Sequence, residues 1–159
     1  MPATHRDRVE AMLDAAAARH EALLPQLPPE LRVSLPVDAQ GITEAIDYVA
    51  QVAGLSADER RTLIRPHAVN PAVMHARVFG GAPLAEETVM GSFVEGARVR
   101  ADALASLADR VGASAEVREL LVADPLPLPE DGFAGVDALR AAYEAQERAV
   151  IAIATRLDD

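Results

Sequence analysis

Apolar residues recur every three or four positions over most of the chain, which is the spacing of amphipathic helices. Two long stretches show this pattern best, one at about 83–111 and one from Asp131 or Gly132 to about 157. The first has the stripe Met90, Phe93, Ala97, Ala101, Leu104, Leu107 and Val111, and the second has Val136, Leu139, Tyr143, Val150, Ile153 and Leu157. Gly91, Gly96 and several alanines lie near the first stripe, so neighbouring helices can approach it closely. We expect the 83–111 helix to be central.

Capping signals predict the other helices. A first helix is expected to follow the N-cap Thr4 and to run to about residue 24, and a second to cover 40–53 and to end at Gly54. A third helix begins at the capping-box pair Ser56 and Glu59 and ends at Pro66. Two more short helices are expected, one at 71–79 between Asn70-Pro71 and Gly80-Gly81, and one that Ser114 caps and that ends near residue 123.

Two proline-rich segments, 25–37 and 124–130, interrupt the helical pattern. Residues 31–37 alternate like a strand, but Pro36 argues against a central strand and no second strand is evident to pair with it. We interpret both segments as extended connections. No internal repeat is visible, so the sequence predicts a single all-α domain over 1–159, an irregular helical bundle with two proline-rich extended connecting segments.

Composition excludes several classes of function. The chain has no cysteine, which rules out disulfides, thiolate zinc sites and cysteine nucleophiles. No apolar run approaches the ~20 residues that span a bilayer, and the first residues are charged where a signal peptide is apolar. We therefore expect a cytoplasmic protein without a membrane partner. The net charge of −10 disfavours nucleic acid as a partner.

One segment has the opposite charge. Residues 60–83 contain four arginines and no acidic residue, so they carry +4 while the rest of the chain carries −14. Because arginine forks bind carboxylates and phosphates, the segment predicts a site for a small anionic ligand. Its candidate ligand-binding residues are Arg61, Arg65, His67, His75 and Arg77. The alternative is that these arginines simply pair with surface carboxylates.

Signals for catalysis, metals and DNA are weak. The histidines and glutamates form no Glu-x-x-His pair, so we expect no metal site, and no nucleotide-binding loop predicts a cofactor. No serine lies in a nucleophile-elbow motif, so no catalytic residue is identified and an enzyme stays an open question. Residues 49–56 resemble the start of a helix-turn-helix, but Asp58 and Glu59 would lie where DNA is contacted.

The leading hypothesis is a non-catalytic helical protein that acts through self-association or by binding a protein partner. The proline-rich segments or the small-residue helix faces would supply the contact. The alternative is a module that binds a small anionic molecule, or a cofactor-free enzyme, with a pocket between helices. A DNA-binding regulator is the remote alternative.

Overall fold

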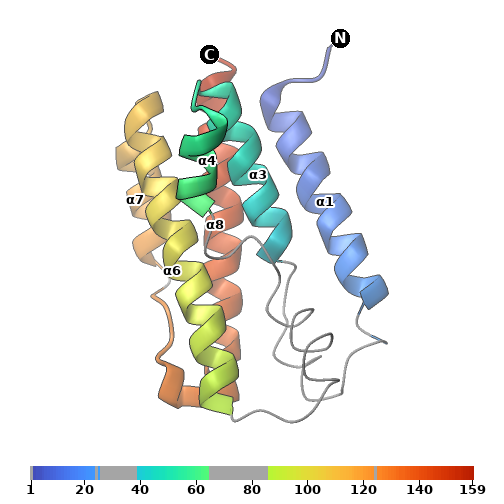
Figure 1. Ribbon diagram of the computed structural model, residues 1–159, viewed down its shortest axis with the longest axis vertical. Helices are drawn as coiled ribbons and strands as arrows, with labels where there is room; N and C mark the ends of the chain where they lie inside the picture. Colours follow the sequence, from blue (N-terminus) through green and yellow to red (C-terminus); the bar gives the residue numbers. More distant parts are fainter. Residues whose placement is uncertain (1, 24, 26–38, 65–85, 124) are drawn as a thin grey trace.

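The computed structural model describes residues 2–23, 25, 39–64, 86–123 and 125–159, and all of its regular structure there is helical (Figure 1). The elements are α1 (His5–Leu23), α3 (Ala39–Val52), α4 (Ala57–Ile64), α6 (Glu86–Val111), α7 (Ser114–Ala123), the 3₁₀ segment η3 (Pro129–Gly135) and α8 (Val136–Leu157). The predicted all-α bundle is confirmed. Of the predicted extended segment at 25–37, the structure describes only Pro25, which is 3₁₀-helical; the rest of that segment and the predicted helix at 71–79 lie outside the described residues.

The C-terminal helix α8 occupies the middle of the bundle. It packs against α1, α3, α6, α7 and η3, while α6 packs against α3, α4, α7, α8 and η3. Both predicted apolar stripes are buried over most of their length, from Met90 to Leu107 on α6 and from Val136 to Ile153 on α8. Alanines fill the spaces between these larger side chains. Because α6 and α8 each pack against five other elements, the central position predicted for the 83–111 helix is shared with α8.

Local capping signals fix two of the helix ends as expected. Gly54 has a φ of +94°, and the N–H groups of Gly54 and Leu55 donate to the carbonyls of Gln51 and Ala50 at 3.1 and 3.0 Å. These two bonds form a Schellman motif that ends α3. At the start of α1, Thr4 and Asp7 exchange hydrogen bonds between side chain and backbone at 3.0 and 3.1 Å.

The predicted role of Ser114 as an N-cap is wrong. Ser114 is the first residue of α7, and its hydroxyl donates to the carboxylate of Asp109 rather than accepting a backbone N–H. The reason is the tightness of the turn between α6 and α7. Gly112 has a φ of +80°, Ala113 donates its N–H to Ala108 at 2.9 Å, and the carbonyl of Ala113 already accepts the N–H of Val117.

The predicted start of the last helix is also wrong, because α8 begins at Val136 and not at Asp131 or Gly132. Gly132 adopts φ +57° and ψ −143°, which no helix accommodates, so the 3₁₀ segment η3 is kinked at this residue and α8 begins only after it. Asp131 accepts the N–H of Leu128 at 3.0 Å and closes the turn. Of the predicted extended segment 124–130, residue 124 lies outside the described residues, 125–128 are irregular and 129–130 belong to η3; Pro127 is buried against Gly135.

The first helix is held in the bundle by few apolar side chains. Val9 and Ala16 are its only fully buried hydrophobic residues in the described chain. Polar contacts add to them, since Arg19 forms an ion pair with Glu44 of α3 at 3.1 Å and His5 hydrogen-bonds the hydroxyl of Tyr48 at 2.8 Å. Because few apolar side chains hold α1 in place, its packing depends strongly on a close approach to α3.

Asp158, just beyond α8, caps α1 from the other end of the chain. Its two carboxylate oxygens accept the N–H groups of His5 at 2.8 Å and Arg6 at 3.1 Å. Desolvation alone would raise the pKa of Asp158, but these backbone hydrogen bonds outweigh it and lower the pKa below its ordinary value. The two termini consequently lie at the same end of the bundle (Figure 1).

Replacing Gly41 by alanine should destabilise the protein by about 1–3 kcal/mol, because the new Cβ would overlap the Cβ of Ala16 where α1 crosses α3. Gly91→Ala is the matched control: its Cβ would have ordinary contact with Pro129 at 3.7 Å. Better helix propensity should make that variant up to about 1 kcal/mol more stable. Urea denaturation measures both, and equal effects would contradict the close approach of α1 to α3.

Asp158→Ala should lower the melting temperature by a few degrees at pH 7, because two N–H groups at the start of α1 lose their acceptor. Since the folded-state pKa of Asp158 is lowered, its contribution is present above the ordinary pKa of 3.8 and is lost as the pH falls through the folded value. Thermal melts from pH 7 to pH 2 should therefore show the wild-type advantage vanish in acid. Asp159→Ala is the control, and an equal loss there would exclude the cap.

Candidate functional site

Of the five residues predicted to bind an anion, the structure describes one. Arg61 lies on α4 with 71% of its side chain exposed, and it forms an ion pair with Asp58 one turn earlier. Arg65, His67, His75 and Arg77 lie outside the described residues. Arg60, in the same basic segment, pairs with Asp47 at 3.1 Å and donates to the carbonyl of Leu55. Both described arginines thus pair with surface carboxylates, and the anion site of this segment stays a prediction.

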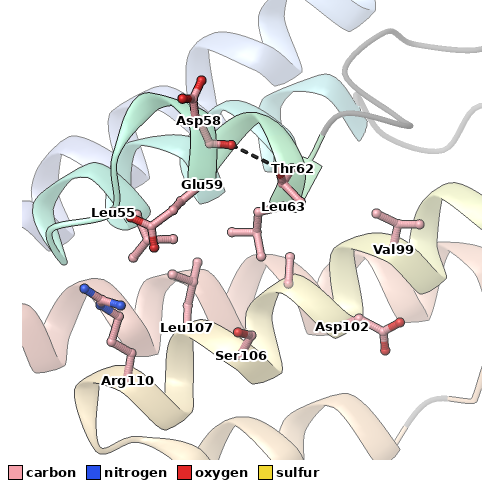
Figure 2. A pocket seen from close by; sticks show the side chains of 11 residues that line it. Leu55, Asp58, Glu59, Thr62, Leu63, Val99, Asp102, Ser106, Leu107 and Arg110 are labelled. Atoms are coloured by element: carbon pink, nitrogen blue, oxygen red, sulfur yellow. Dashed lines mark hydrogen bonds between the residues drawn. The ribbon is translucent and has the colours of Figure 1, made fainter.

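A cavity of about 720 Å³ lies between α4 and α6. Figure 2 shows Leu63 of α4 and Leu107 of α6 extending toward each other across it. We call this cavity the α4–α6 groove. Its aliphatic lining is Leu55, Leu63, Val99, Ala103 and Leu107, and its polar lining is Asp58, Glu59, Thr62, Asp102, Ser106 and Arg110.

The α4 wall of the groove is built by a reciprocal capping box. The N–H of Ser56 donates to the carboxylate of Glu59 at 3.0 Å, and the N–H of Glu59 donates to the hydroxyl of Ser56 at 3.1 Å. The predicted capping box is confirmed. The N–H and hydroxyl of Ser56, and then the charge of Arg110, lower the pKa of Glu59. None of the residues of α4 is fully buried, so this cap is important for keeping α4 helical.

The charged side chains of the groove differ in whether an ion pair or hydrogen bond with another described residue engages them. Asp58 points away from the cavity and pairs with Arg61 (Figure 2). Arg110 donates to the carbonyl of Ala53 at 3.2 Å, near Glu59, at one end. Asp102, toward the other end, is exposed and has no ion pair with any described residue. The groove therefore combines an aliphatic floor with an excess of negative charge.

The polar lining of the α4–α6 groove can be compared with the groups that catalysis and metal binding use. Among the described residues that line the groove, Ser106 is the one serine, and none is a histidine that could act as its base. Within the described ranges, no three His, Asp or Glu residues lie close enough together to hold a metal ion. Aliphatic side chains surrounded by a few charges are typical of a surface that receives another molecule.

Sequence reasoning overlooked a buried arginine between α6 and α8. Arg100 is 4% exposed, its Nε donates to Oε1 of Gln146 at 3.0 Å, and its guanidinium carbon lies 4.9 Å from the ring centre of Tyr143. The amide nitrogen of Gln146 donates to the carbonyl of Ala97 at 2.7 Å. Burial raises the pKa of Tyr143 above its ordinary value, and the charge of Arg100 opposes part of that shift.

The spacing of the helical stripes could have revealed this cluster. Arg100 lies seven residues after Phe93 and four before Leu104, so a helix places it on the buried face. Gln146 falls in the same way between Tyr143 and Val150. A polar residue at a position of the apolar stripe indicates a buried polar contact between helices.

The chain matches no family model, no curated protein and no solved structure. No helix of the described residues is both long and apolar enough to cross a membrane. The α4–α6 groove and the Arg100 cluster are therefore the features of the described structure that bear on function.

Ser56→Ala should loosen α4 by about 1 kcal/mol, because its cap bond to Glu59 is lost and α4 has no fully buried side chain to compensate. Hydrogen exchange should speed up at the amides of α4 while those of α8 remain protected. Ser92→Ala, at an exposed position of α6, is the control. Unchanged exchange in α4 would show that the capping box does not maintain the groove.

Proposed function

We propose that the protein is a non-catalytic binding protein whose α4–α6 groove receives an amphipathic helix of another protein, with aliphatic side chains in the groove and basic side chains at its edge. The observation that supports this most directly is the aliphatic floor beside Asp102, a carboxylate that no described residue neutralises. The absence of cysteine fits a partner met in a reducing compartment such as the cytoplasm.

The shape of the groove favours a helix as the occupant. Helix-in-groove recognition uses aliphatic anchors spaced by three or four residues, which enter a hollow between two helices of the receptor. Leu55, Leu63 and Leu107 offer such a hollow along α4 and α6. Leu107 belongs to the core, so the floor is rigid, whereas Leu63 is half-buried and can be covered by a partner.

Charge favours a partner over a second copy of the chain. A net charge of −10 attracts basic surfaces and repels another molecule of the same protein. If two copies met symmetrically through their grooves, each Asp102 would approach the acidic lining of the other copy. Of the two forms of association that the sequence left open, partner binding therefore agrees better with the charges of the groove.

A synthetic amphipathic peptide of about 18 residues, with leucines on one face and arginines beside it, is the probe for this proposal. Fluorescence anisotropy should show binding that weakens with salt, and none for the same peptide with glutamates in place of arginines. Asp102→Arg should weaken binding of the arginine peptide about tenfold.

Glu119→Arg is the matched control, because it makes the same change in net charge at an exposed position of α7 outside the groove. It should leave binding close to that of the wild type. In ¹⁵N-labelled protein, amide shifts caused by the peptide should concentrate on α4 and on the part of α6 from Val99 to Arg110. Equal losses in the two variants, or equal binding of both peptides, would refute the proposed groove interaction.

A further inference from the structure

Arg100 is a buried cation whose charge no described residue balances. Only 4% of its surface is exposed, and it forms no ion pair with a carboxylate in the described chain. Its Nη2 atom is enclosed and has no hydrogen-bond acceptor in the described parts of the chain. A guanidinium stays protonated at any physiological pH, so it cannot avoid the cost of burial by losing its proton. An uncompensated buried charge is strongly destabilising, and a bound anion would remove that cost.

The surrounding residues fix the direction of this charge without neutralising it. Gln146 donates its amide N–H to the carbonyl of Ala97, which turns its amide oxygen toward Nε of Arg100. The guanidinium carbon of Arg100 lies over the ring of Tyr143, 4.9 Å from the ring centre, which restricts where the guanidinium can move. The hydrogen bond to Gln146 engages Nε, and Nη2 has no acceptor among the described residues. A donor held in place and left unsatisfied is what a preorganised oxyanion site requires.

We infer that Arg100, oriented by Gln146 and Tyr143, is the anchor of a binding site between α6 and α8 for the carboxylate group of a small molecule. A carboxylate is planar and accepts hydrogen bonds from a guanidinium in the plane of both groups. It also carries a single negative charge, which matches the one cation of the cluster. A phosphate dianion would leave a net negative charge in the interior, so the carboxylate is the better match.

This site is distinct from the α4–α6 groove. Arg100 does not line the groove, although Val99, Asp102 and Ala103 on another side of α6 do. The two inferences can therefore fail independently. Asp102→Arg should weaken peptide binding about tenfold while leaving any response to carboxylates intact, and changes at Arg100 should have the reverse effect.

The test is a thermal-shift titration of the full chain with sodium acetate, sodium propionate and sodium phosphate, each compared with sodium chloride at equal ionic strength. Acetate or propionate should raise the melting temperature progressively with concentration, as expected for a ligand that binds only the folded state. In ¹⁵N spectra, the Nε–H resonance of Arg100 should shift with the same midpoint. No stabilisation beyond that of chloride would overturn the inference, and stabilisation by phosphate alone would overturn its carboxylate specificity.

Arg100→Met removes the charge while keeping an elongated apolar side chain, and a buried ion replaced in this way often leaves a folded protein. It should abolish the carboxylate-dependent shift. Arg100→Lys keeps the positive charge but loses the guanidinium fork, so it should weaken the carboxylate-dependent stabilisation about tenfold. This variant also tests the site if Arg100→Met does not fold. Arg98→Met, at an exposed arginine of the same helix that pairs with Glu95, is the control and should respond like wild type. A loss in Arg98→Met equal to that in the Arg100 variants would overturn the site.

Discussion

Close packing around α8 is the constraint on which the rest of the described structure depends. The helices α1, α3, α6 and α7 all bury part of their surface against it, and η3 covers its first turns. The chain has only 3% aromatic residues, so the interior is filled by aliphatic side chains and alanines, and the helices must lie near one another to exclude water. Gly41, at the crossing of α1 and α3, has no space for even a methyl group.

The same packing gives α6 two chemically different sides. One side meets α8 and encloses Arg100 with Tyr143 and Gln146, where a fixed cation has an unsatisfied donor. Another side meets the short helix α4 across the groove, where Asp102 remains in solvent beside aliphatic side chains. Because α4 has no fully buried residue, the groove depends on the cap between Ser56 and Glu59 and on partial contacts such as that of Leu63. The buried site is held by the core, and the surface groove by a marginal helix.

Predictions from the sequence were accurate where the cause was local. The Schellman motif at Gly54 and the capping box at Ser56 involve residues within a few positions of each other, and both are confirmed. Predictions failed where a tight turn overrode the local signal, as at Ser114, which follows Gly112 too closely to act as a cap. For the candidate anion site, Arg61 is engaged by Asp58, an interaction that i,i+3 spacing allows but does not require.

The all-α class, the two long apolar stripes and several helix ends follow from sequence pattern alone, because these depend on helical periodicity and on hydrogen bonds between near neighbours. Other features require the folded arrangement of the helices: Asp158 caps α1 across almost the whole chain, α4 lies over α6 to form a groove, and no described carboxylate pairs with Arg100. Each of these depends on the distance between residues far apart in sequence. Helical spacing indicates which side of a helix is buried, but only the packing of the helices determines which residues it meets.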